Sequence, residues 1–399
     1  MRIRRKEISR FEPLNRSGVS VERRHLRKRK FAALCRDAAT SKGIPVLGAG
    51  LVSAAGNSIA EVAAAFRSGG PAATLFPVPA ISPTAQVKVL ACGEFGAEQF
   101  IEPAKRRKLS RIQQMTLVAA RKALGVELIG ATAPENICAV IGTGLGSLTD
   151  TAAFVENLIL KDERSPRPAL FTSSVHNSLA SQVAIELKLA GLNSTPVQRE
   201  ISFETALWQG ANELASGRAD LALVGAADEL NQYHLAAGMR WGWWNKTSPR
   251  ALPGEGCALF TLGRAETAAA PLAFVSAIRI GRNEKPDAAA EAKWILETLE
   301  RDGIAPGEVD LLLTGANGVP AQDEFYDSVA AEFSQRIGHA VLLRDYQHVC
   351  GEHHSASAFG FLTAIGLVRG EIAAERACKT VVLLTLSSTG TKGMCCLRA

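Results

Sequence analysis

Residues 137–160 read ICAVIGTGLGSLTDTAAFVENLIL and carry the pattern that indicates the fold class. A short apolar run comes first, glycines follow it, and residues 149–160 then repeat apolar side chains at helical spacing. Outward from this stretch, a helical pattern at 203–216 precedes a second apolar run, LALVGAA, at 221–227, and another run, IPVLGAGLV, begins at Ile44. This alternation predicts the α/β class with a largely parallel sheet.

The same order of elements occurs twice along the chain. After an alanine-rich stretch the pattern restarts with a strand at 274–281, a helix at 287–301 and a strand at 309–315. A long helix near 112–124 and a short strand near 195–199 are also expected in the first half. A repeated order indicates two halves of similar architecture. We predict an N-terminal extension, an N-terminal half and a C-terminal half, at residues 1–43, 44–268 and 269–399.

The positive charge of the chain is concentrated in the N-terminal extension. The formal net charge is +6, but residues 1–43 hold fourteen Lys and Arg against four Asp and Glu, so the remainder is slightly acidic. We therefore predict no nucleic-acid partner for the body, and a disordered extension or, alternatively, an arm for an anionic partner. No apolar stretch follows the basic residues as a signal peptide or membrane span would require, and the eight cysteines show no paired CxxC spacing. Both observations favour a cytoplasmic protein.

Two short motifs resemble ligand sites but lack essential features. The segment GTGLGS at 142–147 follows a strand, yet Ser147 stands where a dinucleotide-binding loop has its third glycine. The segment HVCGEHH at 348–354 is rich in metal-binding residue types, but neighbouring residues cannot all face one ion, and no second cluster of similar density exists in the sequence. We therefore predict neither a cofactor nor a metal. The chain also has no GxSxG or HExxH motif of a hydrolase.

Five phrases together resemble the β-ketoacyl-acyl carrier protein synthases, in the order and at the spacing of that family. They are VLGAGLVSAAGNSIAEV (46–62), IGTGLGSL (141–148), NSLASQVAIELKLAGLN (177–193), LASGRADLALVGAADE (214–229) and PGEGCALFTLGRAE (253–266). The resemblance extends from about residue 44 to 397. It implies the thiolase fold, in which two α/β halves form a five-layer α-β-α-β-α sandwich, and a dimer whose active sites lie near the interface.

The resemblance also implies where the catalytic residues of such a synthase would stand. The family has a nucleophilic Cys at a helix N-terminus, where the helix dipole lowers the pKa of its thiol. That position lies seventeen residues before Gly217 and is occupied by Glu200. A carboxylate is stable there but cannot hold a thioester. Ser202, two residues later, is a weak alternative nucleophile without an evident base.

The positions of the two family histidines and of the lysine are also changed. TGANGVPAQD at 314–323 resembles the motif of the first His and has Gly315 in its place. YQHVCGEHH at 346–354 has Glu352 at the second His and Gln347 at the Lys. His353 takes the second position only if a one-residue gap is allowed. Gly315 has no side chain that could donate a hydrogen bond to a substrate, and an ionised Glu352 would repel an anionic substrate.

The catalytic positions are changed while the other family phrases are retained, and in this the chain resembles the chain-length factors. Those proteins pair with an active ketosynthase and do not catalyse the condensation reaction themselves. We therefore predict a chain-length-factor-type subunit that forms a heterodimer with a ketosynthase, or else a homodimer, and meets an acyl carrier protein. The pathway class would be fatty acid, polyketide or aryl-polyene-like biosynthesis. Glu200 departs even from the usual Gln of chain-length factors.

Two other interpretations stay open. The chain is alternatively an enzyme in which Glu200 and Glu352 act as acid and base on an acyl thioester, or an active 3-oxoacyl synthase with a displaced nucleophile such as Cys350. The acidic residues are alternatively structural, pairing with Arg199 or Lys392, and this is favoured for Glu204. We expect the apolar helices around Trp208 and Phe359 to pack at or beside the partner interface. The three tryptophans of RWGWWNK either line a substrate channel or belong to the core or an interface: Trp241, Trp243 and Trp244.

Overall fold

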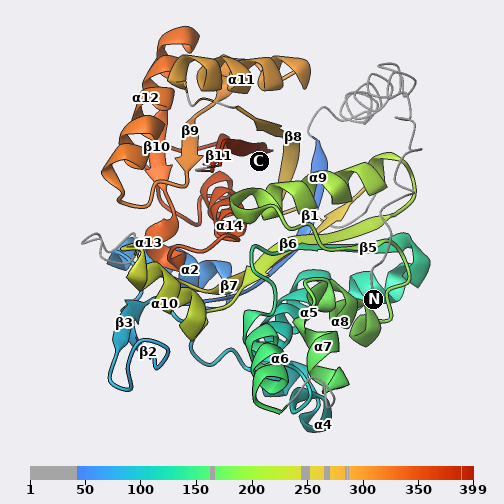
Figure 1. Ribbon diagram of the computed structural model, residues 1–399. Helices are drawn as coiled ribbons and strands as arrows, with labels where there is room; N and C mark the ends of the chain where they lie inside the picture. The colour runs from blue at the N-terminus through green and yellow to red at the C-terminus, as the bar shows by residue number, and fades with distance from the viewer. Residues whose placement is uncertain are drawn as a thin grey trace, which may run out of the picture.

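A computed structural model describes residues 43–161, 167–243, 252–264, 270–283, 285, 287–387 and 389–399. They form alternating layers of helices and sheet, α-β-α-β-α, as Figure 1 shows. The predicted fold class is therefore confirmed. The predictions for the basic extension fall almost entirely outside the described residues, which begin at Gly43.

Ten strands of the described chain form one sheet with a repeated topology. The first half contributes β1 (Ile44–Ser53), β4 (Ile137–Gly142), β5 (Asn193–Ser194), β6 (Leu221–Asp228) and β7 (Gly256–Gly263). The second half contributes β8 (Ala273–Arg282), β9 (Leu311–Thr314), β10 (Leu342–Asp345), β11 (Thr380–Leu386) and β12 (Thr391–Arg398). In each half the spatial order is third, second, fourth, fifth, first, and β1 pairs with β8 where the halves meet. The predicted internal repeat is confirmed.

The sheet is mixed, so the prediction of a largely parallel sheet was wrong. The second, third and fourth strands of each half are parallel, but the fifth is antiparallel to the fourth and the first is antiparallel to the fifth. Short buried apolar runs look alike whichever way the strand points, so the sequence pattern does not report direction.

Two helices form the central layer and contact both halves of the sheet, α9 (Ser202–Ala215) and α14 (Ser357–Val368). Every residue of α14 is buried, as expected of a helix that is apolar on all sides. The outer layers contain α5 (Arg111–Ala131) and α8 (Ser178–Leu187) on the first half, and α11 (Ala288–Arg301) and α12 (Pro320–Ile337) on the second (Figure 1). None of the helices in the described ranges has the length and apolar character that a membrane span needs.

Shorter elements complete the described fold. They are α2 (Ile59–Ser68), α3 (Ala97–Phe100), α4 (Pro103–Arg106), α6 (Leu148–Lys161), α7 (Pro168–Ser174), α10 (Gln232–Arg240), α13 (Gln347–Cys350) and the hairpin of β2 (Thr74–Pro77) and β3 (Gln86–Val89). Three short 3-10 turns, η1 (Pro134–Asn136), η2 (Arg199–Ile201) and η4 (Pro306–Glu308), join larger elements.

Helix α5 packs directly against β1 because a glycine removes the side chain between them. A Cβ atom on Gly50 would lie 2.0 Å from the Ala119 carbonyl oxygen, well inside contact distance. The helix begins at Arg111 because Ser110 and Gln113 form a capping box. It was predicted to end near residue 124, and Gly125 does leave the helical conformation there, with φ 62°, before a further helical segment continues to Ala131.

The strand predicted at 195–199 is wrong in position and length. The structure has β5 at Asn193–Ser194, followed by Pro196, which has no N–H to donate to a neighbouring strand. Residues Arg199–Ile201 instead form η2, which leads into α9. This turn positions the side chains of the site described next.

Candidate functional site

The position predicted for the nucleophile lies at the N-terminus of α9, in the middle of the molecule. Arg199, the first residue of η2, adopts the left-handed conformation, with φ 52°. The Ser202 hydroxyl has one hydrogen, which the carbonyl oxygens of Arg199 (2.7 Å) and Thr143 (2.9 Å) share, and it accepts from the Gln198 N–H (2.9 Å). Ser202 therefore stabilises the turn, and its hydroxyl is engaged on every side.

The Glu200 carboxylate is held by two side chains from the second half. The Ser387 hydroxyl donates to Glu200 Oε2 at 2.6 Å, and His354 Nδ1 lies 3.5 Å from Glu200 Oε1. Burial opposes ionisation of Glu200, but the bonds from His354 and Ser387 outweigh it and lower the pKa of Glu200 to about 2. The same pair raises the pKa of His354 against the effect of its burial. Glu200 and His354 thus form an ion pair.

The suggested ion pair between Glu200 and Lys392 is not present in the structure, because Lys392 binds another glutamate. Lys392 Nζ lies 2.6 Å from Glu291 Oε2, in a pair that is almost fully buried. Lys392 is thereby committed to the second half of the molecule. Sequence reasoning overlooked His354 and Ser387, although His354 was visible in the HVCGEHH segment.

Gly315 and Gln347, the predicted first His and Lys positions, are neighbours. Gln347 Nε2 donates to the Gly315 carbonyl oxygen at 3.3 Å. A Cβ atom on Gly315 would meet the hydroxyl oxygens of Tyr326 at 3.2 Å and Tyr346 at 3.4 Å. Two buried tyrosines therefore occupy the space that a side chain at position 315 would need.

Glu352 and His353 lie where a loop of the second half meets the segment before β7 of the first half. The backbone of Glu352 bonds to Gly254 and Leu252, which precede β7. The His353 ring is enclosed, contacts Phe359 edge-on at 5.7 Å and places Nδ1 3.0 Å from the Ser355 hydroxyl. Burial lowers the pKa of His353 to about 4, so its ring is neutral at pH 7.

The glycine-rich loop after β4 binds a carboxylate of its own chain. Asp228 Oδ1 accepts from the Thr143 hydroxyl and from the N–H groups of Gly144 and Leu145, each at 3.0 Å. These amides are the groups that a nucleotide phosphate would use in a dinucleotide-binding loop. In the described residues no group of three or more metal-ligating side chains is placed to hold an ion.

Aromatic rings connect the protein surface to His354. The ring centroids of Trp241 and Trp243 are 4.7 Å apart, Trp243 and His234 are 6.5 Å apart, and His234 and His354 are 6.4 Å apart. Trp241 is the most exposed of these residues. The prediction for Trp244 lies outside the described residues.

Two other predicted residues are buried in the core. Phe359 belongs to the central hydrophobic cluster, which corrects its assignment to a partner interface. Cys350 is fully buried, and burial raises the pKa of its thiol far above the usual range. Cys350 therefore lacks the thiolate character that a displaced nucleophile needs.

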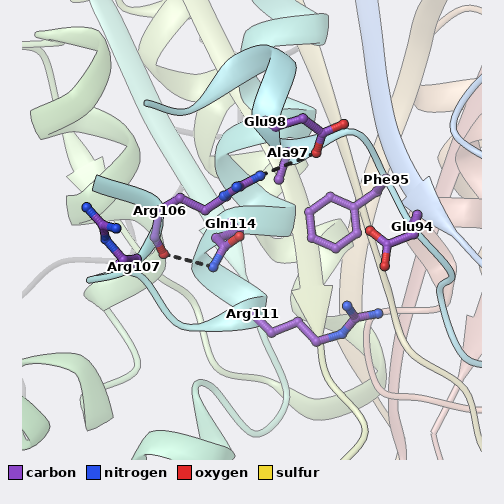
Figure 2. A pocket seen from close by; sticks show the side chains of 8 residues that line it. All are labelled: Glu94, Phe95, Ala97, Glu98, Arg106, Arg107, Arg111 and Gln114. Carbon is purple, nitrogen blue, oxygen red and sulfur yellow. Dashed lines mark hydrogen bonds and ion pairs between the residues drawn. The ribbon is translucent and has the colours of Figure 1, made fainter. Parts of the chain in front are cut away.

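An open pocket of about 400 Å³ lies away from Glu200, beside the short helix α4. Figure 2 shows its lining side chains: Glu94, Phe95, Ala97, Glu98, Arg106, Arg107, Arg111 and Gln114. Arg106 reaches Glu98 at 3.4 Å, whereas Arg111 is held by Glu255 at 3.0 Å. Arg107 points away from the Phe95 ring in this view. Three arginines and two glutamates line the pocket, so its rim carries a small net positive charge.

Two plant enzymes are among the proteins similar in sequence. A chloroplastic 3-oxoacyl-[acyl-carrier-protein] synthase I from Arabidopsis thaliana is 24% identical over 259 residues, which are 57% of this chain and 55% of the plant protein. The enzyme of the same name from Hordeum vulgare is 22% identical over 261 residues, or 57% of this chain and 56% of that protein. The alignments thus span about half the length of these relatives.

Solved structures share the fold over nearly the whole chain. The ishigamide ketosynthase/chain length factor has a TM-score of 0.73 and 24% identity, covering 89% of this chain and 99% of the other. A ketosynthase (ApeO) in complex with its chain length factor (ApeC) from Xenorhabdus doucetiae has a TM-score of 0.74 and 16% identity, covering 90% and 98%. Residues 41–268 match the family model of the β-ketoacyl synthase N-terminal domain. This match spans more than half of the sequence, and the chain belongs to the β-ketoacyl synthase family.

Proposed function

We propose that this chain is a non-catalytic, chain-length-factor-type subunit that pairs with an active ketosynthase in the cytoplasm. The pathway class would be fatty acid, polyketide or aryl-polyene-like biosynthesis. The observation that carries the proposal is the state of Glu200, which occupies the nucleophile position and already binds Ser387 and His354. The same conclusion is supported at three other positions. The resemblance puts Gly315, Glu352 and Gln347 where the synthases have their two catalytic histidines and their lysine.

The chemistry of the site argues against the alternative in which Glu200 and Glu352 act as acid and base on an acyl thioester. A general base works best with a pKa near the operating pH, and the pKa of Glu200 is about 2. Its two oxygens are engaged by His354 and Ser387, so an incoming thioester would have to break an ion pair first. Gly315 has no side chain that could donate a hydrogen bond to an enolate, and the hydroxyl groups of Tyr326 and Tyr346 lie directly beside it.

The partner surface in this proposal is the free edge of β5. This strand ends the sheet, and residues near it expose apolar side chains, as Leu192 and Val197 do. Helix α9 is tied to the strand through Ser194 and Gln209 (3.1 Å), which brings the exposed Trp208 to the same region. An open strand edge beside exposed apolar side chains is typical of a protein interface.

We further propose that the acyl carrier protein docks on the basic rim of the pocket beside α4. The phosphodiester of a carrier protein's prosthetic arm is an anion, and arginine binds such groups well. Changing Arg106 and Arg107 together to Glu should weaken carrier-protein binding at least tenfold, because attraction becomes repulsion. Fluorescence titration of the assembled pair with labelled carrier protein, at low and high salt, measures the change.

A matched control reverses two arginines elsewhere. Arg336 on α12 and Arg369 after α14 each pair with a neighbouring glutamate and do not line the pocket. The Arg336→Glu and Arg369→Glu double variant should bind carrier protein as the wild type does. Equal losses in both double variants would mean that net charge alone attracts the carrier, and docking at α4 would be excluded.

The proposed function is tested by co-expression with candidate ketosynthases and purification through a tag on this chain. We expect a stable pair that extends malonyl-carrier-protein substrates, no extension by this chain alone, and continued condensation by the partner when Glu200 is changed to Ala. Thioester extension or cleavage by the isolated chain, abolished by Glu200→Ala, would refute the proposal. A homodimer that binds no ketosynthase would refute it as well.

A further inference from the structure

A second acidic side chain, Glu204, lies one helical turn beyond Glu200 and is completely buried. Its Oε2 atom accepts from the Ser357 hydroxyl of α14 at 3.0 Å. We use the name Glu204 cluster for this residue and the polar side chains that interact with it: Ser357, Tyr326, Tyr346 and Thr385. They come from α9, α14, α12, the turn before α13, and β11, so the cluster lies between the two halves.

Several buried polar atoms in and beside the Glu204 cluster have no hydrogen bond of normal geometry. Within the described part of the chain these atoms are Glu204 Oε1, Thr385 Oγ1 and Gln347 Oε1. Thr385 is close enough to Glu204 and Tyr346 to affect their pKa values, and Gln347 joins the cluster through Gly315, which lies beside both tyrosine hydroxyls. Each unsatisfied buried polar atom destabilises the folded chain, because it loses its hydrogen bonds to water without replacing them.

Water is the ligand that commonly satisfies such atoms. Buried waters in proteins make about three hydrogen bonds to polar groups that otherwise have no partner. The unsatisfied atoms here come from an acid, a hydroxyl and an amide, which offer both acceptors and donors. An apolar ligand would leave all of them unsatisfied.

The charges around Glu204 do not favour a carboxylate. Gly393 on β12 packs directly on the Glu204 side chain, and the lysine next to it, Lys392, is bound to Glu291. The titratable groups that face Glu204 from the packed elements are Tyr326, Tyr346 and Cys395, while Glu200 lies in the turn η2 that precedes α9. All of these would be neutral or negative at pH 7.

We propose that the Glu204 cluster is a closed site for ordered water in which Glu204 is held as a neutral carboxylic acid. The O–H group of neutral Glu204 can donate a hydrogen bond to water while the other carboxyl oxygen accepts from Ser357. Burial raises the pKa of Glu204 to about 7, and the smaller opposing effects of Thr385, the Glu204 backbone and Ser357 do not offset it. This inference does not depend on the proposed pairing with a ketosynthase.

The sign of the pH effect follows from the raised pKa. Folding favours the protonated form of Glu204, so this contribution to stability is complete below the pKa of the unfolded chain and is lost as pH rises through about 7. Glu204→Gln keeps the shape and stays neutral. Between about pH 5.5 and pH 8.5 the unfolding constant of the wild type should therefore rise at least tenfold relative to that of Glu204→Gln.

The test combines infrared spectroscopy, crystallography and unfolding of the full chain. At about pH 5.5 the difference spectrum, wild type minus Glu204→Gln, should contain the carbonyl band of a protonated carboxylic acid, and this band should disappear near pH 8.5. Burial also raises the pKa of Glu229 to about 7, but its band is present in both proteins and cancels in the difference. A high-resolution crystal structure should contain water bonded to Glu204 Oε1 or Thr385 Oγ1. A matched control is Glu213→Gln on the same helix, which removes a carboxylate bound to Arg218 and should leave the band in place.

Either of two results would overturn the proposal: density without water at the cluster, or no carbonyl band in the difference spectrum at about pH 5.5. If Glu204→Gln fails to fold, the spectrum of a Glu229→Gln variant decides the protonation state of Glu204, because this variant removes the other described glutamate whose pKa burial raises to about 7. The crystal structure of the wild type decides the presence of water in the same way.

Discussion

Replacing Gly50 by valine should leave the first half of the molecule unable to fold stably. The new Cβ atom would lie 2.0 Å from the Ala119 carbonyl oxygen and 2.8 Å from the Ala123 nitrogen, both on the backbone of α5. Backbone atoms cannot rotate away as a side chain can, so helix and strand must separate. We expect a loss of roughly 4 kcal/mol or more, a large part of the 5–15 kcal/mol that stabilises a typical domain. Urea unfolding followed by circular dichroism measures it.

Gly130, in the same helix, provides the control. A Cβ atom there would meet nothing within 4 Å, and the residue is exposed. Gly130→Ala should be neutral or stabilise the protein by up to about 1 kcal/mol, because alanine favours helix. Equal stability of Gly50→Val and Gly130→Ala would show that α5 does not pack on β1 as closely as described.

Replacing Trp208 by glutamate should abolish stable pairing with a ketosynthase partner, a loss of at least 100-fold in affinity. Trp208 is 38% exposed, lies beside the free edge of β5, and offers the large aromatic surface that interface hot spots commonly use. A charge there would be buried without a partner in the complex. Size-exclusion chromatography and analytical ultracentrifugation of the co-expressed chains measure the effect.

The other edge of the sheet supplies a closely matched control. Leu343 on β10 is 39% exposed and lies at the end of the sheet opposite β5. Leu343→Glu should leave pairing intact. The reverse result, in which only Leu343→Glu prevents association, would place the interface on the second half and contradict the proposed use of β5.

The architecture was largely predictable because helix and strand periodicity is a local property of the sequence. The helix expected at 203–216 corresponds to α9, Ser202–Ala215, and the repeated order of elements appears as a repeated strand order. The direction of the strands was not predictable, since a short apolar run has the same pattern whether the strand is parallel or antiparallel to its neighbour. The position of β5 was missed because Pro196 was counted within an extended segment instead of marking its end.

The candidate site could be located from the sequence, but its contacts could not. The spacing to Gly217 placed Glu200 near a helix N-terminus, and the structure has it in the turn before α9. Its partner Ser387 is 187 residues away in sequence, and no local pattern relates the two. Counting residues put Glu352 at the second His position, with His353 as a weak candidate and His354 not considered, whereas in the structure it is His354 that lies beside Glu200. These outcomes depend on long-range packing.

The position of β1 between β7 and β8 has a consequence for how the protein is made. Both neighbours emerge from the ribosome about 200 residues after β1 does, because β7 starts at Gly256 and β8 at Ala273. At roughly 5–20 residues per second, translation leaves this apolar strand without its partners for about 10–40 seconds. The nascent chain must therefore be shielded from aggregation during that interval, and its yield will depend on chaperone supply and translation speed.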